Sequence, residues 1–349
     1  MNIAFLLENI ASSGGTERVA TLIANQLACR GHRITIISLT GDNPFFELEK
    51  TIRILCIEKK RVRYISFIKQ LINTRKVIAE LNPDILVNVG TNLSLFTWMN
   101  YGSKTRIISW EHFIYERNFT APRLRAGFFL AKKISTKIIL LSDKEASKWN
   151  DPKAVVINNP RSFYTHLQPD YSSKKAIAIG HLNYNKGFDQ LLKAWQKVTG
   201  IHPDASLQIY GQGEEAENLS KLTKELGIES TVSILKPTRD IISAYLNSSV
   251  YLMTSRSENQ PMVVLEAMSC GLPVVAFDCP TGPGEIIHSG EDGILVEPEN
   301  TDNYAEAVIS LLNDCERRKS YGIKGRQNVE KYNIENIILQ WESIFEEIK

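Results

Sequence analysis

Short apolar runs rich in β-branched residues alternate with segments of helical periodicity along this chain of 349 residues. Strands that are apolar on both faces must be covered on both, as in a parallel sheet between two layers of helices. In the first half these runs lie at 3–7, 33–38, 53–57, 85–89, 106–109, 137–141 and 154–157. The alternation predicts an α/β fold built on a doubly wound parallel sheet.

A second series of runs follows a polar stretch at 171–175, and it lies at 176–179, 206–210, 231–235, 250–253 and 273–277. We therefore expect two Rossmann-like domains, 1–165 and 166–330, which is consistent with the length of the chain. The final segment, 331–349, carries an amphipathic pattern over 334–348. It is predicted to form a helix that packs back toward the N-terminal domain.

Composition narrows the class of protein further. With 43% hydrophobic and 23% charged residues, the chain is neither disordered nor fibrous. The five cysteines are scattered and never spaced as Cys-x-x-Cys, so neither a disulfide framework nor a zinc site is expected. The amino terminus lacks the pattern of a signal peptide, and no run reaches the roughly 18 apolar residues of a membrane span. We expect a cytoplasmic chain with at most peripheral membrane association.

The charge is distributed unevenly. Residues 1–165 hold 24 Lys or Arg against 13 Asp or Glu, and residues 166–349 hold 17 against 26, so nets of +11 and −9 add to the overall +2. A basic half predicts an anionic partner such as phospholipid, polyphosphate or nucleic acid. Chance surface composition remains the alternative.

Open α/β sheets bind ligands at the carboxyl ends of their strands, so motifs at strand ends matter most. Gly14 and Gly15 stand between the first strand and a helix, where close backbone approach and free N–H groups suit a phosphate. In the second series Gly180 ends a strand, and Lys186 precedes the next helix, where it would meet an anionic ligand. A plain strand-to-helix turn and an ordinary solvated lysine are the respective alternatives.

The stretch 257–276 is the most specific. Glu258 lies on a loop, Pro261 suits a first helical turn, and Glu266 follows about one turn inside that helix. Two carboxylates eight residues apart suit a polyhydroxylated ligand, one for sugar hydroxyls and one for a ribose diol. The alternatives are a helix-dipole role for Glu258 and a surface ion pair for Glu266.

Taken together, these motifs resemble the family 4 retaining glycosyltransferases of GT-B fold, in which two Rossmann-like domains face each other across a cleft. The resemblance covers nearly the entire chain. The stretch 277–287 is similar to a subgroup that builds bacterial surface polysaccharides and lipid-linked oligosaccharides. Members of that subgroup often transfer galactose or N-acetylgalactosamine from UDP.

The resemblance also implies roles for individual residues. Those that would bind the donor are Gly14, Gly15, His181, Lys186, Lys236, Glu258, Met262, Val263 and Glu266. Of these, Lys186 would neutralise the diphosphate, Glu258 would hold hydroxyls of the transferred sugar and Glu266 would bind the ribose. His112, after a first-domain strand, matches the active-site histidine of the family. The family commonly has Arg where this chain has His181, so either His181 donates a hydrogen bond to the diphosphate or Lys186 carries more of the charge.

The predicted activity is transfer of a hexose or N-acetylhexosamine from a UDP-sugar to a lipid-linked or cell-surface glycan, with retention of configuration and without a metal or other cofactor. We expect the protein on the inner face of the cell membrane, held there by a basic, aromatic surface. We do not expect a nucleic-acid partner. That surface would comprise Lys59, Lys60, Arg61, Arg63, Arg117, Phe119, Arg123, Leu124, Arg125, Phe128, Phe129, Lys132 and Lys133. Core packing is the alternative for Phe128 and Phe129.

Two rival functions remain at this stage. A nucleotide-sugar epimerase of the same architecture would turn over UDP-sugar without an acceptor. A basic nucleic-acid-binding protein would explain the charge of the first half, but it leaves Glu258 and Glu266 unexplained.

Overall fold

The computed structural model describes residues 1–58 and 66–349 and divides the chain into two units. Unit 1 comprises Met1–Pro160 and Tyr332–Lys349, and unit 2 comprises Arg161–Lys331. The chain therefore passes between the units twice. Four basic residues expected at a membrane surface, Lys59, Lys60, Arg61 and Arg63, lie outside the described residues.

Unit 1 is built on a seven-stranded sheet whose order, over the described residues, is β3-β2-β1-β4-β5-β6-β7. Its strands are β1 (Asn2–Asn9), β2 (Arg33–Thr40), β3 (Arg53–Glu58), β4 (Ile85–Val89), β5 (Arg106–Trp110), β6 (Lys137–Leu140) and β7 (Ala154–Val156). Every paired register is parallel. The winding direction switches at β1, which pairs with both β2 and β4, and loops after these strands meet at one edge.

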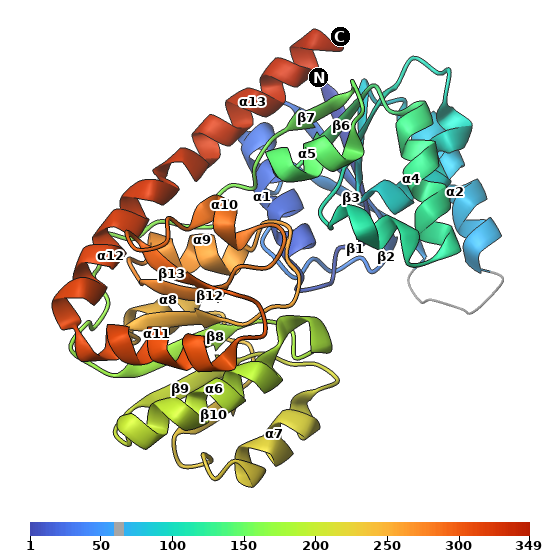
Figure 1. The fold of residues 1–349 in the computed structure, drawn as a ribbon. Coiled ribbons are helices and arrows are strands. Elements are labelled where there is room, and N and C mark those ends of the chain that lie inside the picture. Colours follow the sequence, from blue (N-terminus) through green and yellow to red (C-terminus); the bar gives the residue numbers. More distant parts are fainter. Residues whose placement is uncertain (59–65) are drawn as a thin grey trace. The chain divides into compact units, whose positions relative to one another are not determined.

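Helices cover both faces of this sheet (Figure 1). They are α1 (Gly15–Cys29), α2 (Ser66–Leu81), α3 (Ser94–Thr97), α4 (Pro122–Ile134), α5 (Asp143–Trp149) and α13 (Ile334–Glu347), with short 3-10 turns η1 (Thr91–Leu93), η2 (Trp98–Asn100) and η3 (Tyr115–Phe119). On one face Ala4, Leu6 and Ile37 pack with Ile78 of α2 and Phe96 of α3. Successive residues of β1, β2 and β4 are buried on both faces, which explains why these strands are almost wholly apolar in sequence.

The C-terminal helix α13 belongs to unit 1. The side chain of Asn333 caps it by accepting a hydrogen bond from the Glu335 N–H. Trp341 is fully buried, and its ring centroid lies 4.8 Å from that of Trp110 and 6.5 Å from that of Phe5. The apolar face read from 334–348 therefore covers the sheet face opposite α2.

Unit 2 is built on a six-stranded parallel sheet of order β10-β9-β8-β11-β12-β13. Its strands are β8 (Lys175–Ile179), β9 (Ser206–Tyr210), β10 (Val232–Leu235), β11 (Val250–Met253), β12 (Val274–Phe277) and β13 (Gly293–Val296). The sequence did not predict β13, which is short and begins with glycine. That glycine is required because a Cβ at Gly293 would lie 2.6 Å from the Val274 carbonyl oxygen.

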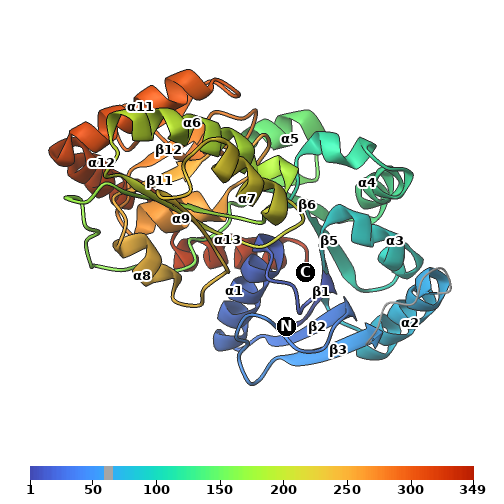
Figure 2. The same cartoon turned by 90° about the horizontal axis from the view of Figure 1, so that it is seen from below.

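The helices of unit 2 again form two layers, and Figure 2 shows α8 and α9 on the face away from α6 and α11. They are α6 (Phe188–Ile201), α7 (Ala216–Glu225), α8 (Ile241–Leu246), α9 (Met262–Ser269), α10 (Pro283–Ile286), α11 (Thr301–Asn313) and α12 (Cys315–Asn328), with 3-10 turns η4 (Tyr184–Lys186) and η5 (Val329–Tyr332). A large core joins α6 and α11 to the sheet through Leu192, Trp195, Tyr304 and Val308. The predicted class, two doubly wound parallel-sheet domains, is confirmed.

One aromatic expected at a membrane surface belongs to the core instead. Phe128 on α4 is 3% exposed and packs against Trp149 with ring centroids 4.6 Å apart, whereas Phe129 is 54% exposed. Lys132 is also engaged, because its ammonium donates to the Trp149 carbonyl oxygen and pairs with Asp151. Among the described residues, no helix combines the length and apolarity needed to cross a bilayer.

Candidate active site

The loop between β8 and α6 in unit 2 carries Lys186 and is locked onto the end of β11. Gly187 has a φ of +64°, and a Cβ there would lie 2.0 Å from the Thr254 carbonyl oxygen. The Thr254 hydroxyl donates to the Gly187 carbonyl oxygen at 2.9 Å. Only glycine fits this close approach, so the Lys186-Gly187 motif fixes where the lysine leaves the backbone.

Lys186 meets Glu258 across this loop. The Lys186 Nζ lies 2.6 Å from Glu258 Oε1, and the two side chains are only 23% and 12% exposed. The structure thus joins two residues that are 72 positions apart and were both predicted as site residues. The alternatives of a solvated lysine and of a mere helix-dipole role for Glu258 do not fit this pair.

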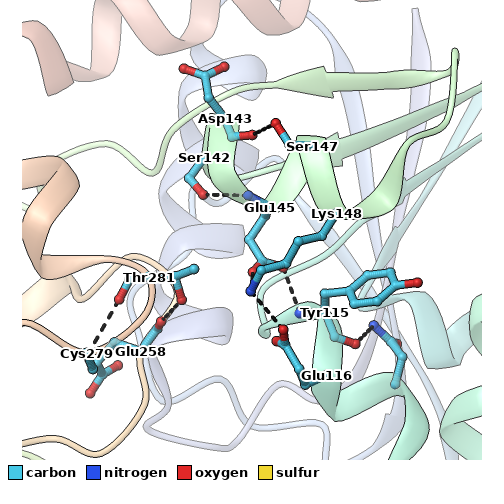
Figure 3. A network of polar contacts seen from close by, with 11 residues as sticks. Tyr115, Glu116, Ser142, Asp143, Glu145, Ser147, Lys148, Glu258, Cys279 and Thr281 are labelled. Atoms are coloured by element: carbon cyan, nitrogen blue, oxygen red, sulfur yellow. Dashed lines mark hydrogen bonds and ion pairs between the residues drawn. The ribbon is translucent and has the colours of Figure 1, made fainter. Parts of the chain in front are cut away.

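Further contacts fix the loop that carries Glu258. Arg256 forms a bidentate ion pair with Asp189, at 2.9 and 2.8 Å, and its guanidinium lies 3.9 Å from the centre of the Tyr184 ring. Burial raises the pKa of Asp189, but pairing with Arg256 outweighs it and leaves this pKa below its usual value. The Thr281 hydroxyl donates to the Glu258 carbonyl oxygen (Figure 3). The carboxylate of Glu258 thus pairs with Lys186, while Thr281 holds the Glu258 backbone.

Helix α9 places the other predicted donor-binding residues of unit 2. Met262 and Val263 form its first turn, where backbone N–H groups lack acceptors within the helix. Glu266 is 1% exposed, and its carboxylate accepts hydrogen bonds from the Ser162 hydroxyl at 2.8 Å and the Tyr245 hydroxyl at 3.1 Å. The alternative of a surface ion pair for Glu266 is wrong, since this carboxylate is buried among hydroxyl groups.

Two further residues predicted to bind the donor, His181 and Lys236, are exposed. His181 is exposed, and its Nε2 lies 3.3 Å from an oxygen of Glu214. Lys236 lies in the loop after β10 and is also exposed. In this structure the partner of Glu258 is thus Lys186, and His181 faces another acid.

In unit 1, Gly14 and Gly15 lie where β1 leads into α1. Gly14 is the N-cap of the helix, and its N–H donates to the Ser12 hydroxyl at 3.3 Å. A Cβ on Gly14 would lie 2.5 Å from a carboxylate oxygen of Glu17, whose pKa burial raises above its usual value. Gly15 is exposed as the first residue of the helix.

His112 follows β5 at the same edge of the unit 1 sheet. Its ring stacks on Trp110 with centroids 4.3 Å apart, and its buried Nε2 has no hydrogen-bond partner among the described residues. Burial lowers the pKa of His112 to about 3, so the imidazole is neutral near neutral pH. A neutral ring with an unpaired nitrogen can exchange a hydrogen bond with a sugar hydroxyl but cannot serve as a cation.

Two buried carboxylates hold the loop that carries His112. Glu111 accepts hydrogen bonds from the N–H groups of His112 and Phe113, each at 3.0 Å. Glu145, at the start of α5, accepts from the Tyr115 N–H at 2.7 Å and contacts Lys148 at 3.2 Å (Figure 3). Burial raises the pKa of both carboxyl groups despite these contacts.

The sequence reading missed several of these residues. Glu111 could have been found, because it stands directly before His112 at a strand end. Ser162, Tyr245 and Thr281 carry no local signal, since each becomes relevant only through a partner far along the chain. In the ranges 1–58 and 66–349, no three His, Cys, Asp or Glu side chains are grouped to hold a metal ion.

Comparison with protein families matches the two halves of the chain to two models. Residues 13–160 match the model described as Glycosyltransferase Family 4, and residues 166–328 match Glycosyl transferases group 1. Together they cover the loops that carry His112, Lys186 and Glu258.

Individual relatives match this chain over nearly its full length. An uncharacterized glycosyltransferase of Haemophilus influenzae is 36% identical, over 98% of this chain and 99% of its own. The Campylobacter jejuni GalNAc-alpha-(1->4)-GalNAc-alpha-(1->3)-diNAcBac-PP-undecaprenol alpha-1,4-N-acetyl-D-galactosaminyltransferase is 25% identical, over 100% and 99%. Among solved structures, the G117R mutant of Staphylococcus aureus TarM in complex with fondaparinux, alpha-GlcNAc-glycerol and UDP superposes with a TM-score of 0.86 at 14% identity, covering 99% of this chain and 100% of that chain. The last likeness shows a shared fold.

Proposed function

The chain belongs to the glycosyltransferases that join a family 4 domain to a group 1 domain, and from this membership we propose that it transfers a hexose or N-acetylhexosamine from a UDP-sugar with retention of configuration. Its fold is the GT-B fold of these enzymes. Galactose and N-acetylgalactosamine are the favoured sugars, because the Campylobacter relative is named for N-acetylgalactosamine transfer.

The observation that carries this proposal is the Lys186–Glu258 pair at the strand ends of unit 2. A diphosphate needs a cation, and a sugar needs a hydrogen-bond acceptor next to it. Lys186 supplies the first, Glu258 the second, and the first turn of α9 adds backbone N–H groups. Glu266 would receive the ribose.

In the proposed reaction a hydroxyl oxygen of the acceptor bonds to the anomeric carbon as the bond from that carbon to the UDP oxygen breaks. Attack and departure occur on the same face, so the configuration is retained, and the hydroxyl proton passes to the leaving phosphate oxygen. Lys186 and the α9 N–H groups stabilise the negative charge that develops on the diphosphate. No metal is needed for these steps, which is the metal-independent reaction we propose.

The acceptor would bind unit 1, where His112 offers a neutral, unpaired nitrogen at a strand end. We propose a lipid-linked or cell-surface glycan as the acceptor, since the name of the Campylobacter relative contains a glycan on PP-undecaprenol. Helix α4 would bring unit 1 to an anionic membrane, since exposed Phe129 lies one turn from Arg125 and from Lys133 on the same helix face. Anionic vesicles should then retain the protein at low salt and release it at high salt, and equal binding to neutral vesicles would contradict this surface.

The test is UDP release from a panel of UDP-sugars, with and without EDTA, for the wild type and Glu258→Ala. We expect one donor to bind and to be hydrolysed slowly without acceptor, and the substitution to abolish this hydrolysis. A matched control is Glu297→Ala, an exposed acid on a loop of unit 2. Failure of every UDP-sugar to bind would refute the proposal, and conversion of a donor to its epimer would identify the rival activity.

A further inference from the structure

We propose that Glu111 is a neutral carboxylic acid in the folded protein and that, in this form, it is a positioning residue for His112. The inference rests on the proposed function for the importance of His112. Its chemical basis is the match between hydrogen-bond donors and acceptors in a buried cluster around Glu111. The members of that cluster are Thr91, Glu111, Tyr115 and Asn118.

The cluster is closed to solvent. Glu111 and Thr91 are each 2% exposed and Asn118 is 5% exposed. They come from three places in the fold: Thr91 begins η1 after β4, Glu111 follows β5, and Asn118 lies in η3. Within such a site every polar hydrogen needs an acceptor, and every acceptor facing a donor must receive one hydrogen.

The orientation of Asn118 fixes the direction of the hydrogen bonds. Its amide nitrogen donates to the Tyr115 carbonyl oxygen at 3.1 Å, so its amide oxygen faces the Thr91 hydroxyl at 3.3 Å. The same hydroxyl forms a short contact with Glu111 Oε2. Thr91 thus has one proton and two oxygen neighbours, and an ionised Glu111 would leave one of the two contacts without a hydrogen.

A proton on Glu111 Oε2 completes the chain. Glu111 then donates to Thr91, Thr91 donates to Asn118, and Asn118 donates to the Tyr115 carbonyl oxygen. The other carboxyl oxygen, Oε1, still accepts from the N–H groups of His112 and Phe113 at 3.0 Å each. Every contact of the cluster is satisfied in this arrangement.

Electrostatics favours the same state. Burial raises the pKa of Glu111, and this outweighs the lowering by the Thr91 hydrogen bond, the two backbone N–H groups and the charge of Arg117 in η3. The guanidinium of Arg117 lies against the Phe113 ring, 3.3 Å from its centre. The adjacent His112 is neutral near pH 7, because burial lowers its pKa to about 3. The acid is therefore not compensated by a full ion pair.

The functional consequence is a rigid backbone at His112. Oε1 of Glu111 holds two consecutive N–H groups of the loop, and the chain through Thr91 and Asn118 ties the same loop to η1. Deprotonation would break one link of this chain. The rate of sugar transfer to the acceptor should then fall at alkaline pH as Glu111 loses its proton. The affinity of unit 2 for the donor should not change with this deprotonation.

Glu111→Gln is the decisive variant, since glutamine reproduces the neutral acid: Oε1 accepts two N–H groups and Nε2 donates to Thr91. We expect its kcat/KM for the acceptor to lie within about threefold of wild type at neutral pH and to lose the alkaline limb that this acid causes. In infrared difference spectra, the wild type should show a protonated-carboxyl band that Glu111→Gln lacks. Glu116→Gln, an exposed acid of the same loop paired with Lys148, should leave that band in place.

Absence of the band, or a Glu111→Gln enzyme whose acceptor KM rises at least tenfold, would overturn the proposal because an ionised carboxylate would then be needed. The infrared band does not depend on activity. If the wild type releases no UDP from any donor, the proposed function fails while the band still decides the state of Glu111.

Discussion

Replacing Glu258 by glutamine should strengthen the binding of UDP alone while it weakens the use of UDP-sugar. In the structure the Lys186 ammonium lies 2.6 Å from Glu258 Oε1, so an arriving diphosphate must share the lysine with a carboxylate. A phosphate oxygen bound to the same ammonium would lie about 5 Å from that carboxylate, given hydrogen bonds of about 2.8 Å. Two unit charges at this distance repel by roughly 1.5 kcal/mol at an effective dielectric constant of about 40.

Removal of this repulsion corresponds to about tenfold tighter binding of UDP by Glu258→Gln. The same variant loses a charge-assisted hydrogen bond to the sugar, worth about 1.5 to 3 kcal/mol, and the relieved repulsion offsets part of this, so kcat/KM for the donor should fall by at most about tenfold. Isothermal titration with UDP and initial-rate assays with the UDP-sugar measure the two effects separately.

Lys186→Met is the companion variant, and it should weaken UDP binding because the diphosphate loses its cation. In the double variant Glu258→Gln/Lys186→Met the gain from removing the acid should persist, since the repulsion between carboxylate and diphosphate does not require the lysine. Weaker or unchanged UDP binding by Glu258→Gln would refute this account, because it would mean that the carboxylate does not repel the bound diphosphate.

Three further outcomes concern stability. Gly187→Ala should lower the melting temperature and destabilise unit 2 by more than about 1 kcal/mol, because the new Cβ would lie 2.0 Å from a carbonyl oxygen at a φ of +64°. Gly200→Ala, in an open part of α6, should stabilise the protein slightly. Equal melting temperatures for the two variants would contradict the steric reasoning. Trp341→Ala should destabilise unit 1 by about 3 to 5 kcal/mol in denaturant titrations. Leu339→Ala, at a position 55% exposed, should change the free energy of unfolding little. A small effect of Trp341→Ala would show that α13 does not complete this core. Burial lowers the pKa of His112 to about 3 in the folded protein, so the stability that its neutral form contributes is fully present above about pH 6.5. Between about pH 6.5 and pH 3 the free energy of unfolding should fall on this account by at most about 1.4 kcal/mol per pH unit. His112→Gln should flatten this acid limb of the stability–pH curve, and an unchanged limb would assign it to other groups.

Most of the fold could be read from local patterns because a parallel sheet imposes apolar strands and short connections. The runs at 85–89, 206–210 and 250–253 coincide with β4, β9 and β11. β13 was missed because Gly293 opens it, and the need for glycine arises from the neighbouring strand. For Phe128 and Phe129 the sequence leaves two possibilities open, since the periodicity fits both a surface and a core position. Only the packing of Trp149 decides that Phe128 is buried.

The two halves of the site differ in how far sequence can define them. In unit 2 the residues that contact the donor in our proposal stand in contiguous motifs, so Lys186, Glu258 and Glu266 could be named before their partners were known. The residues that hold them, such as Arg256 with Asp189 and Thr281 with Glu258, are joined by tertiary contacts alone.

In unit 1 the position of His112 depends on burial, which no spacing reveals. A solvated Glu111 would be an ordinary ionised acid, and a solvated His112 would titrate near pH 6.5. Their removal from water makes both neutral in our account, and the same burial leaves His112 with an unpaired nitrogen. A neutral group on the acceptor side and a cation on the donor side suit the reaction we propose, because charge develops on the leaving diphosphate and not on the attacking hydroxyl. A cation at His112 would instead depress the nucleophilicity of any hydroxyl to which it donated a hydrogen bond.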